Sequence, residues 1–487
     1  MRLLDTTTIT FKSFFNNASI PPYAILSHTW GEEEVTFQDL LTPKAKDMIG
    51  YKKISDCCKQ AVADGFELAW VDTCCIDKTS SAELSEAINS MYQWYQDAQV
   101  CYVYLADVPS CDALSPKSKF AKSRWFTRGW TLQELLAPQS VVFYSSEWIE
   151  LGTKSSLQPA ITAITGVSKV VLLLNHPGEI SVAQRMSWAA NRETTRVEDI
   201  AYCLLGLFGV NMPAIYGEGE NAFVRLQFEI LKTSDDESIF AWKGDGKSEG
   251  GMLARSPTQF RDSGAVERIK PESSRTPFSM TNSGLHIELP LIPTGHVSEE
   301  KIFQAILNCV HVHSNNKSRL GIYLKQLEGQ QFTRVHRDEV FILAGSHSKD
   351  LPPNTESQLL YVREKDPSVF DVEHRMRPEK QYRFRITNLP LMEHDGIELS
   401  DLTPIDRWEG RGEDMELVLQ YSGRGALMFR NAGGNLFAVM IGMHNYNTWC
   451  DIRTDVVEQT VGRLGFLLER CNHGMEKFGS RHQVTIR

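Results

Sequence analysis

Short apolar runs alternate with segments of helical periodicity over the first 150 residues. The run at 23–26 (YAIL) is followed by small and polar residues from Ser27 to Gly31. This pattern is typical of a buried strand that ends at the edge of a sheet. Similar runs predict further strands at 67–72, 100–105 and 141–144. Apolar residues at three- and four-residue steps predict helices at 49–64, 82–98 and 123–136. Strands separated by helices favour a parallel, doubly wound α/β sheet.

Two capping signals predict where helices begin. Ser80 and Glu83 have the three-residue spacing of a capping box, in which a serine or threonine and a later glutamate satisfy each other's backbone donors. Thr195 and Glu198 have the same spacing and predict a helix over 199–208. We therefore expect Ser80 to be the N-cap of the helix at 82–98 and the second pair to open the helix at 199–208.

The pattern of the chain changes after residue 242. Residues 243–251 (KGDGKSEGG) have the composition of a flexible linker. Beyond them, short runs of strand-forming residues separated by Gly, Pro and Asn predict an antiparallel β structure. We therefore divide the chain into an α/β domain at 1–150, a helical extension of that domain at 151–242 and a C-terminal, mainly antiparallel β domain at 252–487.

Composition places the chain among globular proteins and limits the possible partners. It has 487 residues, of which 42% are hydrophobic and 23% charged, and its net charge is −10. A negative charge without a basic run argues against nucleic-acid binding, and no segment has the roughly 18 apolar residues of a membrane span. The N-terminus lacks the apolar core of a secretory signal. The ten cysteines form no C-x-x-C pair, so we expect reduced thiols, no metal site and a cytoplasmic location.

Four motifs occur in order along the first 140 residues: YAILSHTWG at 23–31, WVDTCCIDK at 70–78, AELSEAINSMYQWYQDA at 82–98 and SRWFTRGWTLQELLAP at 123–138. Together they resemble the fungal heterokaryon-incompatibility (HET) domain, and the resemblance extends from about residue 1 to 242. HET domains are in turn distantly similar to TIR domains. The resemblance implies a TIR-like fold for the parallel sheet.

The similarity to TIR domains also implies a site. In TIR domains that cleave NAD, the catalytic glutamate lies on a late helix, and Glu134 occupies the comparable place in this chain. Its spacing from Trp130 is one residue wider than in the TIR pattern. The implied substrate-binding residues are Ser27, His28, Trp30, Asp72 and Trp130. NAD would be a consumed substrate, so no bound cofactor and no metal are implied.

The chemistry of NAD cleavage suits a carboxylate and an aromatic ring. Breaking the nicotinamide–ribose bond develops positive charge on the ribose, as in glycoside hydrolysis. A partly desolvated carboxylate stabilises that charge, and a ring can stack on the leaving nicotinamide. The apolar positions of this helix are supplied by Trp130, Leu132, Leu135 and Leu136. We therefore expect the Glu134 carboxylate to lie outside the core.

Each of these residues also has a purely structural interpretation. Glu134 could be a surface carboxylate paired with Arg124 or Arg128. His28 could be a structural hydrogen-bond donor, and Asp72 could hold a turn. Only the arrangement of the side chains can distinguish these alternatives.

For the chain as a whole, the resemblance implies a fungal vegetative-incompatibility protein that causes programmed cell death, a form of innate immunity. We expect it to hydrolyse NAD to nicotinamide and ADP-ribose, to self-associate on activation and to respond to an unknown protein trigger. The alternative is a non-enzymatic signalling module that self-associates, with the β domain as its recognition surface.

Overall fold

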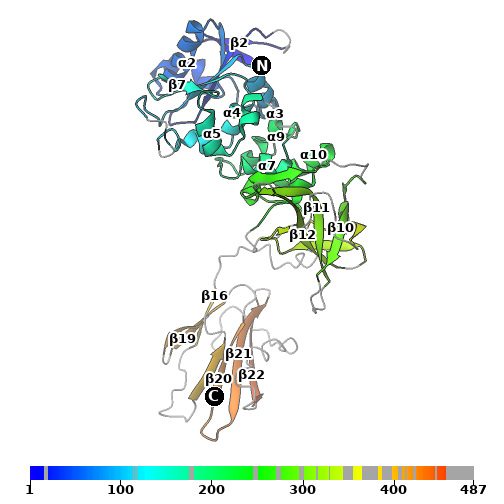
Figure 1. The fold of residues 1–487 in the computed structure, drawn as a ribbon. Helices are drawn as coiled ribbons and strands as arrows, with labels where there is room; N and C mark the ends of the chain where they lie inside the picture. Colours follow the sequence, from blue (N-terminus) through cyan, green and yellow to red (C-terminus); the bar gives the residue numbers. More distant parts are fainter. Residues whose placement is uncertain are drawn as a thin grey trace. The chain divides into compact units, whose positions relative to one another are not determined.

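The computed structural model describes residues 1–15, 20–112, 115, 118–174, 180–244, 251–269, 276–294, 301–313, 316–327, 329–343, 355–364, 382–386, 398–403, 408–411, 414–419, 424–444 and 447–456. They fall in two compact units, Met1–Lys365 and Asp366–Arg487, which are described separately (Figure 1). The three domains expected from the sequence therefore do not coincide with the two units. Residues 245–250 of the expected linker lie outside the described residues.

The first unit begins with a mixed sheet of strand order β2-β1-β4-β3-β5-β6-β7. Its strands are β1 (Arg2–Asp5), β2 (Phe11–Ser13), β3 (Ala24–His28), β4 (Leu68–Trp70), β5 (Val100–Tyr104), β6 (Val141–Tyr144) and β7 (Glu150–Thr153). The four central strands are parallel, whereas β1, β2 and β7 pair antiparallel at the two edges. This confirms the predicted parallel α/β arrangement and adds edge strands that the sequence pattern did not predict.

Helices cover both faces of this sheet. The Cys101 thiol of β5 donates to the carbonyl of Glu134 on α4 (Thr131–Leu136). The next residue, Tyr102, donates from its hydroxyl to Asp64 at the end of α2 (Tyr51–Ala63). Because consecutive residues of a strand point to opposite faces, α2 and α4 lie on opposite sides of the sheet. The third long helix here is α3 (Ser81–Asp97), and α1 (Phe37–Leu40) and the 3₁₀ turn η2 (Pro43–Asp47) precede α2.

The segment predicted as one helix over 123–136 is divided, so that prediction is wrong in part. A 3₁₀ turn, η3 (Arg124–Thr127), is followed by extended backbone at Arg128 and then by α4. Arg128 bridges to Glu193, and a Cβ on Gly129 would lie 2.5 Å from the Thr194 side chain. The close approach of this second chain segment explains the break, because its pairing with 128 requires an extended conformation.

One of the two predicted capping boxes is present only in half, and the other is absent. The Ser80 hydroxyl accepts from the Glu83 amide and caps α3, while the Glu83 carboxylate binds Arg2 and the amide of Asp77. At the second pair, the Glu198 carboxylate accepts from Gly217 and Gly219. In both pairs the carboxylate of the glutamate therefore binds other groups instead of the backbone N–H of the first residue of the pair.

Helices follow the sheet as predicted, although the expected helix over 199–208 is two short ones. They are α5 (Gln158–Thr165), α6 (Lys169–Leu174), α7 (Val182–Ser187), α8 (Asp199–Tyr202), α9 (Leu205–Phe208) and α10 (Asn221–Thr233). Gly206 on α9 packs against α3, where an added Cβ would lie 2.0 Å from the Cβ of Tyr92. In the described residues, no helix is long and apolar enough to cross a membrane.

The first unit ends in a second sheet, of order β14-β12-β13-β15-β10-β11-β8, with β9 paired to β10. Its strands are β8 (Val266–Arg268), β9 (Ser279–Thr281), β10 (Gly284–Pro293), β11 (Ile302–His313), β12 (Asn316–Gln326), β13 (Gln331–Val335), β14 (Phe341–Ile342) and β15 (Glu356–Val362). The turns η5 (Glu237–Phe240), η6 (Pro257–Phe260) and η7 (Ser263–Ala265) connect it to the helices. One hydrophobic core runs from Leu3 to Val362 through both sheets.

The second unit is antiparallel wherever it is described. One sheet contains β16 (Tyr382–Ile386), β19 (Asp414–Leu419) and β18 (Trp408–Arg411), and the other contains β17 (Glu398–Thr403), β20 (Arg424–Arg430), β21 (Leu436–His444) and β22 (Asn447–Val456). These strands and those of the second sheet confirm the predicted β-rich C-terminal half.

Candidate active site

Glu134, Ser27 and Trp125 form a buried hydrogen-bonded group, here called the Glu134 group. The Ser27 hydroxyl at the end of β3 donates to Oε2 of Glu134 at 2.5 Å. The indole Nε1 of Trp125 donates to the Ser27 oxygen at 2.8 Å. The parallel sheet brings these residues together because β3 ends beside α4, although Ser27 and Glu134 are 107 positions apart.

Burial has a strong effect on the Glu134 carboxyl group. Only 6% of the residue is exposed, and the removal of water raises its pKa to about 8. The hydrogen bond from Ser27 and the positive charge of Arg192 oppose this rise, whereas the charge of Asp72 adds to it. Glu134 is therefore largely neutral at pH 7, and a cation placed beside it would promote its ionisation.

The expectation that this carboxylate lies outside the core is wrong. Glu134 is also not the surface carboxylate paired with Arg124 or Arg128 that the structural interpretation required, since it is buried and receives its hydrogen bond from Ser27. The reason is that α4 is covered on all sides: each of its residues is buried. A short helix between a sheet and another layer has no solvent face.

Arg192 lies behind α4 as a buried cation. Its Nη1 atom donates to the Thr131 hydroxyl at 2.9 Å and to the Arg128 carbonyl at 2.8 Å. Its Nε atom donates to the Trp188 carbonyl at 3.2 Å. Burial lowers its pKa to about 10, so the guanidinium stays charged at neutral pH. It therefore supplies positive charge near Glu134 and fixes the first turn of α4.

His28 belongs to a different group of side chains from Ser27. Its Nδ1 atom is 3.7 Å from the Asp72 carboxylate and its Nε2 atom is 4.0 Å from the Glu34 carboxylate. Neither ring nitrogen has a hydrogen-bond partner among the residues that the structure describes, although the side chain is only 1% exposed. Burial, assisted by Lys53, lowers its pKa to about 4 and keeps the ring neutral. Ser27 and His28 are consecutive strand residues, which accounts for their separation onto two faces.

Asp72 and Trp30 lie nearer the surface at this edge. The indole Nε1 of Trp30 donates to Asp72 Oδ2 at 2.7 Å, and the Lys78 ammonium lies 3.6 Å from the centre of the Trp30 ring. Trp30 is 46% exposed. The negative charge of Asp72 raises the pKa of both Glu134 and His28, so it is the electrostatic link between the two groups.

In the described residues, the side chain of Trp130 contacts α8 and not the Glu134 group. Its side chain hydrogen-bonds to Asp199 on α8, which lowers the pKa of that carboxyl group against the effect of burial. The described contacts place Trp125 against Ser27. Both tryptophans precede Glu134 in the sequence motif at 123–138, so the motif also contained Trp125 as a candidate. The four-residue helical spacing between Trp130 and Glu134 led to the prediction of Trp130 instead. Glu34 and Lys53 carried no sequence signal.

The Glu134 group is closed in this structure. Ser27 is 0% exposed and Trp125 is 1% exposed. Two surface cavities, one lined by Lys52 and Trp148 and the other by Tyr323 and His336, contain no residue of this group in their lining. A ligand would reach the carboxyl group only after the covering side chains moved.

Burial also raises the pKa of the Cys74 thiol well above its usual value, which disfavours a cysteine nucleophile beside Asp72.

The comparisons with known proteins match two parts of the chain. Residues 23–116 match the family Heterokaryon incompatibility protein (HET), and residues 403–469 match the family Fungal fruit body lectin. A lectin of known structure, XCL from Xerocomus chrysenteron, is 20% identical, with 20% of this chain and 70% of that chain covered and a TM-score of 0.17.

The chain also resembles a curated protein. Over 225 residues, or 44% of this chain, the sequence is 52% identical to the Vegetative incompatibility protein HET-E-1 of Podospora anserina. The aligned region is 16% of that relative's length. The family match includes Ser27, His28, Trp30 and Asp72, and Glu134 lies beyond its end. On this match and this identity, the N-terminal part of the chain carries a fungal heterokaryon-incompatibility (HET) domain.

Proposed function

We propose that this chain is a cell-death effector of the vegetative-incompatibility type and that its parallel-sheet domain hydrolyses NAD to nicotinamide and ADP-ribose. The observation that carries the proposal is the buried carboxyl group of Glu134, held by Ser27 at the end of a central parallel strand. Ligands of open α/β sheets bind at this edge. A carboxyl group with a strongly raised pKa and a specific hydrogen-bond partner is a recognised sign of a functional site.

The chemistry needs a negative group beside the ribose, because positive charge moves there from the nicotinamide ring. The bond between C1′ of the ribose and the nicotinamide nitrogen breaks, and its electron pair leaves with nicotinamide and neutralises the charge of that ring. The ribose then carries positive charge until water attacks it and loses a proton. Glu134 would lose its proton to solvent water when the cationic substrate binds, because the positive charge lowers its pKa and the Ser27 hydroxyl stabilises the carboxylate. The carboxylate would then take up the proton that the attacking water loses, which restores the neutral group.

The other residues have supporting roles in this proposal. Trp125 fixes the Ser27 hydroxyl, and Arg192 fixes the first turn of α4. Asp72 and the exposed ring of Trp30 would contact the substrate at the mouth of the site. The TIR-like character of the fold, the cytoplasmic location, the self-association and the protein trigger are parts of the same proposal.

The test is to incubate the purified full chain with NAD and to measure nicotinamide and ADP-ribose by chromatography, with and without a crowding agent. Glu134→Gln should lower the rate by about 100-fold or more, as the loss of an electrostatic group in an active site does. Glu229→Gln is the matched control, because Glu229 lies on the surface of α10 and pairs only with Lys232 among the described contacts. Product formation that is equal in both variants would refute the assignment.

A second function is proposed for the C-terminal unit. Its match to the family Fungal fruit body lectin supports a role as a carbohydrate-recognition surface. This role is compatible with the enzyme and also with the alternative of a non-enzymatic module that signals by self-association. Binding of the full chain to a glycan array would test it, and the absence of binding to any glycan would contradict it.

A further inference from the structure

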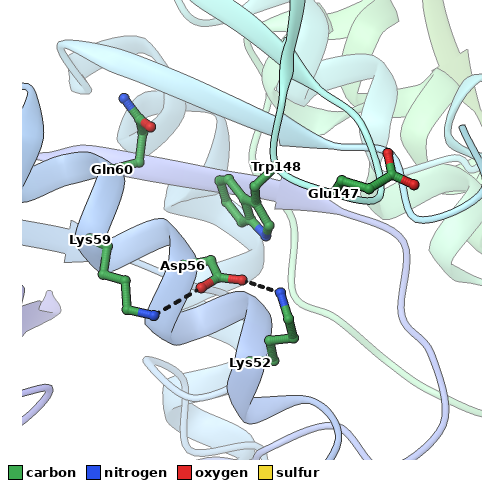
Figure 2. Close-up of a pocket in the computed structure, with 6 residues that line it drawn as sticks. All are labelled: Lys52, Asp56, Lys59, Gln60, Glu147 and Trp148. Atoms are coloured by element: carbon green, nitrogen blue, oxygen red, sulfur yellow. Dashed lines mark hydrogen bonds and ion pairs between the residues drawn. The ribbon is translucent and has the colours of Figure 1, made fainter. Parts of the chain in front are cut away.

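A cavity of about 350 Å³ lies on the α2 side of the first sheet, apart from the Glu134 group. It is lined by Lys52, Asp56, Lys59, Gln60, Glu147 and Trp148 (Figure 2). Helix α2 supplies the first four of these residues, and the turn between β6 and β7 supplies the last two. Its volume is in the range of small-molecule sites, about 300–1,000 Å³.

The backbone of Trp148 is in an unusual conformation. The Ser145 amide donates to the Ile149 carbonyl, and the Trp148 amide donates to the Ser145 carbonyl, which closes a three-residue hairpin turn. The last residue of such a turn adopts a left-handed conformation and is normally glycine or asparagine. Here it is Trp148, with φ of 59°. A bulky residue in this conformation is an outlier, and outliers of this kind are concentrated at functional sites.

The indole ring of Trp148 is held in place, but its N–H group is unsatisfied. Tyr104 stacks on the ring with a centroid distance of 5.2 Å, and Tyr144 packs at 5.3 Å. The Nε1 atom is enclosed and has no hydrogen-bond partner among the described residues. A buried donor without an acceptor is rare in native structures. Figure 2 shows the ring beside the Asp56–Lys52 pair, with its nitrogen toward that pair.

Donors outnumber acceptors in the remaining hydrogen-bonding capacity at this end of the cavity. Lys52 and Lys59 each bind one oxygen of Asp56, at 2.5 and 3.2 Å. An ammonium group has three N–H donors, so each lysine retains two, and each oxygen of Asp56 already accepts from one lysine and retains one further acceptor site. The Glu147 carboxylate points away from this pair (Figure 2) and accepts from Ser110. The complementary ligand is therefore a group with several anionic oxygens.

We propose that this cavity binds a small phosphate monoester. A phosphate group presents three strong acceptor oxygens, which correspond to Lys52, Lys59 and the Trp148 N–H. The organic part of the ligand would occupy the rest of the cavity beside the aromatic rings. The site is independent of NAD cleavage, since it shares no residue with the Glu134 group.

Titration calorimetry on the full chain tests this proposal with adenosine monophosphate, inorganic phosphate and adenosine as probes. The double variant Lys52→Gln/Lys59→Gln should lose at least about tenfold in affinity for the monophosphate, because charged hydrogen bonds are removed. The matched control is Lys44→Gln/Lys46→Gln, which removes two exposed lysines outside the cavity and should bind as the wild type does.

A second variant keeps the test meaningful if the double variant is unstable. Trp148→Phe removes the N–H donor together with the five-membered ring but keeps an aromatic ring at this position. It should weaken binding several-fold and abolish the ligand-induced change in tryptophan fluorescence. Circular dichroism should show that both variants are folded. The proposal is overturned if no saturable binding occurs at millimolar concentrations or if the control variant loses as much affinity as the double variant. Equal affinity for adenosine monophosphate and adenosine, or for adenosine monophosphate and inorganic phosphate, would also overturn it.

Discussion

The carboxyl group of Glu134 makes folding stability depend on pH in a direction opposite to that of most carboxylates. Its pKa is about 8 in the folded protein against 4.5 in a solvated chain. Between these values the folded state holds a proton that the unfolded state has lost. The free energy of unfolding therefore falls as pH rises from about 4.5 to 8, by up to about 1.4 kcal/mol per pH unit.

Glu134→Gln removes this titration while it keeps an acceptor for Ser27. We expect the stability of the wild type, measured relative to the variant by denaturant unfolding, to decline steadily from pH 4.5 to 8 and to level off above pH 8. His28 has the opposite effect, because its pKa is lowered from 6.5 to about 4, so its contribution is lost as pH falls through that window. A difference between wild type and Glu134→Gln that does not change with pH would contradict the burial of this carboxyl group.

Ser27 allows a second prediction at the scale of the residue. Ser27→Ala leaves the indole N–H of Trp125 without its described partner and leaves Glu134 with the hydrogen bond to Tyr95 alone, and an unsatisfied buried group costs about 1–3 kcal/mol. It also removes the hydrogen bond that lowers the pKa of Glu134, so any NAD cleavage should shift to higher pH. Ser155→Ala, at an exposed serine, serves as the control in both measurements. A loss of stability no larger than that of the control would argue against the hydrogen-bonded group.

At this scale the sequence motifs identified Glu134 and Ser27 as neighbours but not their environment. The strand-end pattern places Ser27 at the edge of the sheet, and the helix motif places Glu134 nearby. Burial of Glu134 depends on the helices that follow the sheet, which supply Arg192 behind α4. The choice between Trp125 and Trp130 depends on the break at Gly129, which a helical periodicity does not reveal.

At the scale of the element, Gly206 is the contact point between α9 and α3. An added methyl group would lie 2.0 Å from the Cβ of Tyr92, an atom that cannot move without the helix backbone. Gly206→Ala should therefore lower the free energy of unfolding by at least about 1–3 kcal/mol, the usual range for overpacking. Gly264→Ala is the control, because its Cβ would meet only the Ser187 hydroxyl at 3.7 Å. Thermal unfolding of both variants measures the difference, and equal midpoints would exclude close packing of α9 on α3.

The long periodic elements were predicted better than the short ones. Helix α3 and the four parallel strands follow from apolar spacing, because their patterns are determined by burial on one or both faces. The edge strands β1, β2 and β7 are short, and they form only because a neighbouring strand is present. The helix predicted over 199–208 is broken at Cys203 and Leu204 into α8 and α9.

At the scale of the whole molecule, the HET-like part and the second sheet of the first unit are joined by buried polar contacts. The Arg334 guanidinium of β13 donates to the carbonyls of Phe240 and Trp242 at 2.9 and 2.7 Å and stacks on the Trp242 ring. The Glu237 carboxylate accepts from the amide of Asn308 on β11 at 2.7 Å. The sequence predicted a linker after residue 242, and it could not show that strands beyond it complete the same core.

Truncation of the chain tests this continuity. A fragment of residues 1–365 should unfold cooperatively with a midpoint near that of the full chain. A fragment of residues 1–242 should expose the core surface normally covered by the second sheet and should bind a hydrophobic dye at neutral pH. Calorimetry and dye fluorescence measure the two properties. A stable 1–242 fragment without dye binding would show that the two parts fold independently.

The continuous core has a consequence for the slowest motions of the protein. Amide hydrogens in the centre of a cooperative unit exchange with solvent only when the whole unit opens, so they share one opening free energy. Because the core extends from Leu3 to Val362, the protected amides of β3 beside Ser27 and those of β11 should exchange at one common rate under conditions that favour global opening. A change that loosens the second sheet would then expose the Glu134 group to solvent at the same moment.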